Sequence, residues 1–350
     1  MTRFLTPVAL LAAGMLLGST TGHAWDKPSE RYLDVHKTYS GASCPLEADQ
    51  IAHFVYFARD RDAIHDHPLL KNERLAGAQI MYSWRQLEPA RGRYDFSAIQ
   101  DDLVYLAAHG KKLFVQLQDA SFSQAFKPVP NYLLTLQFDG GVSPQFTDEG
   151  RLEGWVAKRW NSAVQDRFAA LLAALGAEFD GEIEGLNLQE TAIGITARTD
   201  ASFSPEKYAH GLKVNLRALK SAFPTSTVMQ YANFMPGEWL PWENKGYLRG
   251  LYDFGEETGV GLGAPDLIYT RKGQLNHALA MMHEGNYTTP LGIAVQDGNY
   301  IGTTNTLKVV DDHENIVPVL HAFAKDFLKV DYMFWGNQKP YFEQDLLSCL

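Results

Sequence analysis

The chain has 350 residues, of which 45% are hydrophobic, 21% charged and 12% aromatic, a globular composition that excludes collagen, coiled coil and intrinsic disorder. Its 41 acidic residues outnumber 31 lysines and arginines, and the formal net charge is -10. Because this charge repels phosphate backbones and anionic lipid heads, we expect no nucleic-acid partner.

Residues 1–24 have the pattern of a signal peptide. Arg3 precedes an apolar run over 7–17, and small and polar residues follow as far as Ala24. The run is too short to span a bilayer, and no later stretch offers about 18 consecutive apolar residues, so we expect no membrane insertion. The pattern predicts an exported protein, periplasmic or secreted, with residues 25–50 as an N-terminal extension.

The two cysteines, Cys44 and Cys349, lie near opposite ends of the chain. Because export exposes a protein to oxidising conditions, an even pair favours a disulfide between them. The alternative is a pair of separate buried thiols. No histidine-rich context surrounds either cysteine, so neither is expected to be a nucleophile.

Short apolar, β-branched runs alternate with segments of helical period from about residue 51 onward. The strand candidates are 51–57, 75–84, 112–119, 183–190, 227–234, 260–268, 291–297 and 330–335. The clearest helix candidates are 98–109, 161–177, 205–222, 274–283 and 314–328. Ser97 with Gln100 predicts a capping box for the first of these helices, and Gly110 predicts its end.

This alternation predicts an α/β fold, a single (β/α)8 barrel over residues 51–350. The alternative, an open doubly wound sheet, would normally carry a Gly-rich phosphate turn after its first strand, and the sequence has none there. Two segments, 120–159 after the third strand and 236–259 after the fifth, are longer than ordinary barrel loops. Long loops after barrel strands are where substrate clefts are built.

Polar and aromatic residues end most of the predicted strands, at the edge where a barrel keeps its active site. They are Ser83-Trp84, Gln118-Asp119, Gln189-Glu190, Asn233, Asp266, Gln296-Asp297 and Trp335. Carboxylates, amides and tryptophans without clustered metal ligands suit the cleavage of a glycosidic bond. One acid protonates the leaving oxygen, a second carboxylate attacks or activates water, amides hold hydroxyls and indoles stack on sugar rings.

Three stretches resemble the clan A glycoside hydrolases, the cellulase and β-galactosidase-like barrels. The sequence AQIMYSWRQLEPARGRYDFS at 78–97 resembles their second-strand region, which often has the pattern W…EP…G.YDF. GLNLQE at 185–190 is similar to the place of the clan's acid/base glutamate, and YMFWG at 332–336 resembles the place of the tryptophan that floors the sugar site. The resemblance covers most of the chain in architecture but only these stretches in motif.

The resemblance implies that Glu190 is the general acid/base and Trp335 a stacking platform. The clan's nucleophile is a glutamate ending the seventh strand, where this sequence has Gln296-Asp297. Aspartate is one methylene shorter, so three alternatives stay open. In the first, the backbone sits closer and Asp297 is the nucleophile or base. In the second, Asp119 or Asp266 supplies the second carboxylate. In the third, a wider gap between the two carboxyl groups admits water and the enzyme inverts. Without a second carboxylate in range, the barrel would be a non-hydrolytic sugar binder.

We therefore expect Glu190 and Asp297 to be the catalytic pair of an exported glycosidase that needs no cofactor or metal. The negative net charge favours a neutral or amino-sugar glycan over a polyanionic one unless a local basic patch intervenes. The expected substrate contacts are Trp84, Asp119, Asn187, Gln189, Tyr231, Asn233, Asp266, Gln296 and Trp335. Asp119 and Asp266 could equally cap the helices that follow them. The tryptophans could equally be packing residues.

A metal-dependent amidohydrolase is the remaining alternative, because His65-Asp66-His67 forms an H-x-H pair. Such barrels also need histidines ending the fifth and sixth strands, and the segments 230–234 and 263–268 contain none. This spacing disfavours a metal site. A serine hydrolase is also disfavoured, because there is no G-x-S-x-G motif.

Overall fold

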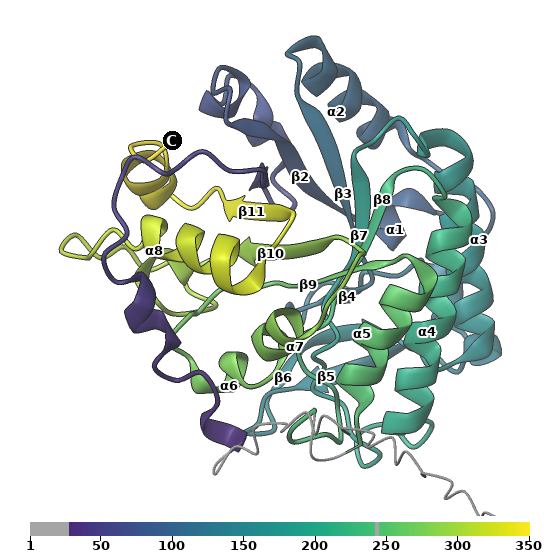
Figure 1. Ribbon diagram of the computed structural model, residues 1–350. Helices are drawn as coiled ribbons and strands as arrows, with labels where there is room; N and C mark the ends of the chain where they lie inside the picture. The colour runs from purple at the N-terminus through teal and green to yellow at the C-terminus, as the bar shows by residue number, and fades with distance from the viewer. Residues whose placement is uncertain (1–27, 242–244) are drawn as a thin grey trace, which may run out of the picture.

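The computed structural model describes residues 28–241 and 245–350, so the predicted signal peptide lies outside the described residues. Parallel strands close into a barrel in the order β1-β11-β10-β9-β8-β7-β3-β2 (Figure 1). Their bounds are β1 Ala52–Tyr56, β2 Leu75–Ser83, β3 Lys112–Gln118, β7 Gly185–Leu188, β8 Thr227–Tyr231, β9 Gly261–Ala264, β10 Leu291–Val295 and β11 Tyr332–Gly336. Seven of these strands lie within their predicted runs, β11 extends one residue beyond its run to Gly336, and the (β/α)8 prediction is confirmed.

Helices surround the barrel (Figure 1). Their bounds are α1 Trp84–Leu87, α2 Ser97–Ala108, α3 Ser162–Phe179, α4 Pro205–Ala222, α5 Tyr247–Thr258, α6 Lys272–Leu275, α7 Ala278–Glu284 and α8 Val317–Ala322. Short 3-10 helices are η1 Pro28–Glu30, η2 Val35–Tyr39, η3 Arg61–Ile64, η4 Pro68–Leu70, η5 Asn131–Leu133, η6 Leu136–Phe138 and η7 Asn299–Ile301, and π-helical turns are η8 Phe323–Leu328 and η9 Phe342–Leu346. None of the described helices is long and apolar enough to cross a membrane.

The helix starts follow local capping chemistry. Asn161 accepts a hydrogen bond from the backbone N–H of Val164 to start α3, and Ser204 does the same with Lys207 at the start of α4. The predicted capping box at Ser97 is wrong. Ser97 is the first residue of α2, and its backbone N–H and hydroxyl both donate to the carboxylate of Asp95 instead.

Two other predictions of local structure need correction. The segment 236–259 is not a continuous loop, because α5 occupies its second half. The single helix predicted over 274–283 is split into α6 and α7. The long loop after the third strand is confirmed, and it contains an antiparallel sheet in the order β4-β6-β5, formed by β4 Ala120–Ser121, β5 Val142–Phe146 and β6 Leu152–Ala157.

Side chains of the barrel strands form two separate apolar clusters. A small cluster of seven residues, which includes Phe54, Phe114 and Phe334, fills the barrel interior, and a much larger one packs the strands against the helices. Successive side chains on a strand point to opposite faces. Trp335 follows Phe334 and therefore belongs to the outer cluster.

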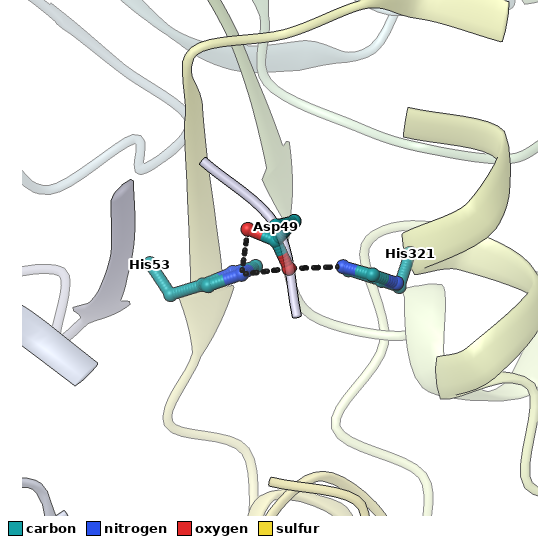
Figure 2. Close-up of side chains that lie close together, drawn as sticks. All are labelled: Asp49, His53 and His321. Atoms are coloured by element: carbon teal, nitrogen blue, oxygen red, sulfur yellow. Dashed lines mark hydrogen bonds and ion pairs between the residues drawn. The ribbon is translucent and has the colours of Figure 1, made fainter. Parts of the chain in front are cut away.

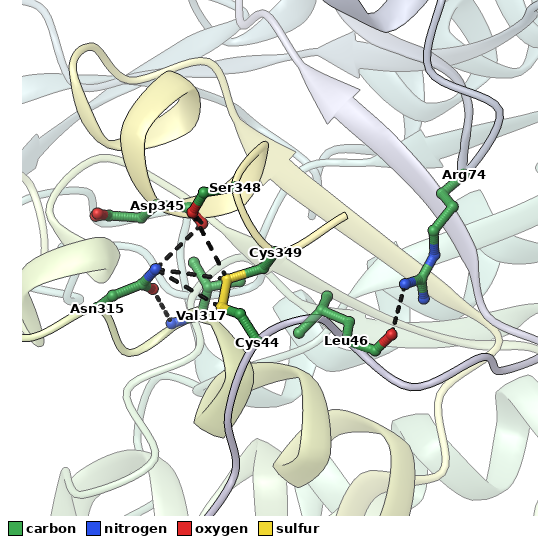
Figure 3. Close-up of a disulfide and its surroundings, with 8 residues drawn as sticks. All are labelled: Cys44, Leu46, Arg74, Asn315, Val317, Asp345, Ser348 and Cys349. Atoms are coloured by element: carbon green, nitrogen blue, oxygen red, sulfur yellow. Dashed lines mark hydrogen bonds between the residues drawn. A yellow bond between two sulfur atoms is a disulfide. The ribbon is translucent and has the colours of Figure 1, made fainter.

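A disulfide between Cys44, in the segment before β1, and Cys349, in the segment after β11, confirms the predicted pairing (Figure 3). The backbone N–H of Leu46 donates to the carbonyl of Cys349 over 2.8 Å. Arg74 in turn donates from Nη1 to the carbonyl of Leu46 over 2.8 Å. The segment before β1 is thus bonded to the chain end after β11 and to the start of β2.

Candidate active site

A cavity of about 210 Å³ opens at the carboxyl ends of the barrel strands. Tyr56 lines it from the end of β1, Gln116 and Gln118 from β3, Tyr231 from the end of β8 and Gln296 from just after β10. Glu190 and Pro265, which follow β7 and β9, also line this cavity. We call this space the central cavity. With Met81 from β2, residues of seven strands or strand ends converge there, as expected for the active face of such a barrel.

A second cavity of about 160 Å³ adjoins the first, and we call it the side cavity. Glu190 and Pro265 line both cavities, so they form the boundary between them. Asn233, Asp266 and Arg271 also line the side cavity. A substrate bridging both spaces would pass directly over Glu190.

Glu190 is partly buried and held by specific contacts. Asn233 donates from Nδ2 to its Oε2 over 2.7 Å, and Arg159 donates from Nη1 to its backbone carbonyl over 2.8 Å. Burial raises the pKa of Glu190 to about 7, an effect opposed by the Asn233 hydrogen bond and reinforced by the negative charge of Asp266. Near neutral pH, this carboxyl group can therefore hold and release a proton.

The second carboxylate that lines the side cavity is Asp266. Burial raises its pKa as well, while a hydrogen bond from Asn299 Nδ2 to its Oδ1, 3.0 Å long, and the charge of Arg271 act in the opposite direction. Asp297 is exposed and lines neither cavity, although burial raises its pKa too. Of the predicted partners for Glu190, Asp266 is the one that shares a cavity with it.

Asp119 and Gln189 are engaged with the protein. Both oxygens of Asp119 accept hydrogen bonds from the buried Arg159, over 2.6 and 2.7 Å. The Oε1 of Gln189 accepts the backbone N–H groups of Asp119 and Ala120, over 3.0 and 2.8 Å. Because Arg159 also holds the carbonyl of Glu190, Asp119 acts on the site through Arg159 and not by facing the cavities.

Asn187 and Tyr231 meet inside the barrel below the central cavity. Gln79 donates from Nε2 to Asn187 Oδ1 over 2.8 Å and to the hydroxyl oxygen of Tyr231 over 3.1 Å. Tyr231 reaches the central cavity, whereas Asn187 is fully buried and lines neither cavity. Asn187 therefore supports Tyr231 through the bridging amide of Gln79.

Neither predicted stacking tryptophan faces a cavity. Trp84 is fully buried in α1, packs edge-on against Phe168 and donates from Nε1 to Glu88 Oε2 over 2.8 Å. Trp335 is fully buried in the outer apolar cluster and donates from Nε1 to His53 Nδ1 over 3.0 Å. Because neither has exposed surface, the expectation that these two side chains contact sugar is wrong.

The lining residues that sequence reasoning missed include Tyr56, Arg59, Gln116 and Arg271. A signal existed for Gln116, because it and Gln118 alternate with apolar residues in the third strand and so share one face. The arginines follow strand ends in loops whose path the sequence does not reveal.

The histidines of the H-x-H pair do not form a metal centre with other described residues. His67 accepts the backbone N–H of Leu69 at Nδ1, and its Nε2 lies 3.1 Å from Asn337 Oδ1. Potential metal ligands do come together in a different cluster, Asp49, His53 and His321, whose ligand atoms lie within 4.8 Å of one another (Figure 2). His53 is near the start of β1, so this cluster lies toward the opposite end of the barrel from the cavities.

The contacts around this second cluster disfavour a cation. The indole N–H of Trp335 points at His53 Nδ1, which places the proton of a neutral imidazole on Nε2, the atom that faces Asp49. Arg74 Nη2 also lies 3.2 Å from Asp49 Oδ2 and already balances its charge. The cluster is therefore a set of hydrogen bonds that holds together β1, α8 and the segment before β1.

No family model and no curated protein sequence matches the chain. Solved structures do match, among them the catalytic domain of beta-amylase from Paenibacillus polymyxa, with a TM-score of 0.56 and 10% identity over 86% of this chain and 99% of that one. Endo-glycoceramidase II from Rhodococcus sp., in a cellobiose-like isofagomine complex, matches with a TM-score of 0.52 and 11% identity over 85% of this chain and 77% of that one. At these identities the similarity establishes a shared fold, the barrel that the resemblance to clan A predicts.

Proposed function

We propose that the protein is a glycoside hydrolase in which Glu190 is the general acid. The observation that carries this proposal is the position of Glu190 on the boundary of two adjoining cavities, with its pKa raised to about 7 and Asp266 beside it. Glycosidases require a pair of carboxyl groups of which one is protonated and the other ionised at the working pH. The similarity of fold to beta-amylase and endo-glycoceramidase II supports the same class of reaction.

In the proposed reaction, Glu190 donates its proton to the glycosidic oxygen as the bond from that oxygen to the anomeric carbon breaks. The ionised Asp266 stabilises the positive charge that develops on the sugar ring. A water molecule finally supplies a hydroxyl group to the anomeric carbon, and its proton passes to the carboxylate of Glu190, which restores the acid. Asn233 and Arg159 hold the side chain and the backbone of Glu190 in place for this transfer.

Asp266 is proposed as the partner in preference to Asp297, the residue favoured by the sequence. Asp266 lines the side cavity with Glu190, and its charge acts on the pKa of Glu190. Asp297 is exposed, and its charge acts on Asp266 and Tyr56. In this proposal Asp297 acts only through its negative charge, from outside both cavities. Gln296, Gln189 and Tyr231 contact sugar hydroxyls in the central cavity.

We also propose that the protein acts after export. The disulfide between Cys44 and Cys349 supports an oxidising compartment. Residues 25–50 would then form an extension that is tied by this bond to a catalytic barrel over 51–350. The proposed partner is a carbohydrate substrate.

Reducing-sugar release from a broad panel of polysaccharides tests the proposal, with wild type, Glu190→Gln, Asp266→Asn and Asp297→Asn compared at equal folded concentration. We expect release by wild type, loss in the first two variants, and a smaller effect in the third. Retention of a glycan without any release would instead support the non-hydrolytic binding barrel. Activity that a chelator abolishes would support the metal-dependent alternative.

A further inference from the structure

Arg59 introduces an unpaired positive charge at the central cavity. It follows β1, lines the cavity together with Glu190 and is exposed. Its guanidinium carbon lies 4.6 Å from the centre of the Phe126 ring, and it forms no ion pair with any carboxylate in the described part of the chain. Arg61, two residues later, differs because both oxygens of Asp102 accept hydrogen bonds from it.

The remaining lining of the central cavity is neutral or can be neutral. Gln116, Gln118, Gln189 and Gln296 contribute carboxamides, and Glu190 is uncharged in the acid form that the proposed function requires. In that form the cavity wall carries a net positive charge from Arg59. The side cavity differs, because the charge of Arg271 there is offset by Asp266.

Two further residues equip the central cavity to hold a sugar ring. Gln118 is 5% exposed, and its Oε1 is buried without a hydrogen-bond partner among the described residues. A buried amide oxygen without a partner is costly, and a ligand hydroxyl would relieve that cost once the side chain turned toward it. Phe122 lines the same cavity with 55% of its surface exposed, and so offers an aromatic face to a pyranose.

From this arrangement we infer that the central cavity is a subsite for an acidic sugar residue, with the carboxylate of a uronic acid bound by Arg59. A planar guanidinium matches a carboxylate in two parallel hydrogen bonds, and its position over Phe126 limits the rotamers it must give up on binding. Gln118 receives a ring hydroxyl and Phe122 packs on the sugar face. The inference rests on the proposed function for the identity of the cavity as a substrate site.

The net charge of -10 favours a neutral glycan, but it acts only at long range. At physiological ionic strength, exposed charges beyond about 8 Å are largely screened. A cation in direct contact with the ligand therefore decides the preference at the site. Arg59 is the local basic group that reverses the expectation drawn from composition.

Ligand-observed NMR titration with the full-length protein tests the inference without requiring hydrolysis. The probes are glucuronate, galacturonate and mannuronate, the matching neutral sugars glucose, galactose and mannose, and glucose 6-sulfate. We expect at least one uronate to bind wild type about tenfold more tightly than its neutral counterpart, and Arg59→Gln to remove that difference. Arg217→Gln is the matched control, because Arg217 is also exposed and lies 4.6 Å from the Phe254 ring but lines neither cavity.

Equal binding of every uronate and its neutral counterpart would overturn the inference, as would a preference that survives Arg59→Gln. Tighter binding of glucose 6-sulfate than of all uronates would overturn the carboxylate assignment and point to sulfated sugars. Uronate binding without any glycan hydrolysis would contradict the proposed function and leave the subsite intact. Hydrolysis of neutral glycans alone would contradict the subsite and leave the proposed function intact.

Discussion

Asn233 donates a hydrogen bond from Nδ2 to Glu190 Oε2 over 2.7 Å, while its own Oδ1 accepts the backbone N–H groups of Ala192 and Phe234. Asn299 has the same relationship to Asp266, donating from Nδ2 over 3.0 Å and accepting the backbone N–H groups of Leu267 and Gln296. Each of these two carboxylates of the side cavity thus has an asparagine that is fixed by backbone N–H groups. The two asparagines can be changed in parallel to separate the roles of the two carboxylates.

Asn233→Asp keeps the oxygen that accepts the two backbone N–H groups but replaces the donor with a second negative charge. The hydrogen bond from Asn233 lowers the pKa of Glu190, so its loss raises that pKa. A general acid is active while protonated. We therefore expect the alkaline limb of the pH profile of kcat/KM to move to higher pH by about one unit. An unchanged or lowered alkaline limb would contradict the assignment of Glu190 as the acid.

Asn299→Asp makes the matching change at Asp266. Its pKa rises, because the hydrogen bond that lowers it is lost. A carboxylate that must be ionised loses function below its pKa, so we expect the acid limb to move to higher pH by about one unit while the alkaline limb stays in place. The same pH titration of kcat/KM measures both limbs. A shift of the alkaline limb alone would show that Asp266 is not the ionised partner.

Asp119→Asn leaves the buried guanidinium of Arg159 without its partner, which we expect to lower the free energy of unfolding by about 3–5 kcal/mol. Because Arg159 also holds the carbonyl of Glu190, kcat should fall on the order of a hundredfold. Glu88→Gln is the matched control, since it breaks the ion pair of Glu88 with Arg167 away from both cavities. Urea unfolding and kcat are measured together. If kcat fell equally in both variants, Arg159 would have no special role at the site.

Replacing Cys44 and Cys349 together with serine removes a cross-link between positions 305 residues apart in sequence. The loss of this constraint on the unfolded chain should lower the free energy of unfolding by about 2–5 kcal/mol. Guanidinium unfolding measures the change. A reductant should destabilise wild type by the same amount and leave the double variant unaffected. Equal stability of wild type and the double variant would mean that the hydrogen bonds around Leu46 hold the segment before β1 to the segment after β11 by themselves.

The sequence predicted the barrel well because its strands carry a local signal. Runs such as 112–119 and 291–297 are largely apolar and are separated by helical periodicity, and β3 and β10 lie within these two runs. Strand ends were less accurate. The predicted run at 260–268 extends four residues beyond β9, which ends at Ala264, because the buried apolar residues Leu267 and Ile268 continue the hydrophobic pattern into the loop.

The faces of the strands could not be predicted from composition alone. In a barrel both faces of a strand are buried, so apolar residues occupy consecutive positions and the alternation that marks a single core face disappears. Trp335 was for this reason placed at the cleft, although Phe334 is the residue that points inward. The sequence likewise cannot show that Asp266 lines a cavity and Asp297 lines neither, because the path of the turn after β10 depends on tertiary contacts such as the hydrogen bond from the backbone N–H of Gln296 to Asn299.

The most direct test of the account is the pH dependence of reducing-sugar release by wild type and by Glu190→Gln on the same glycan. For wild type we expect release to decline at alkaline pH with a midpoint near the Glu190 pKa of about 7. The variant, shown by circular dichroism to be folded, should lose about two to four orders of magnitude in kcat. Release by Glu190→Gln at the wild-type rate, with the same alkaline limb, would contradict the assignment of Glu190 as the proton donor.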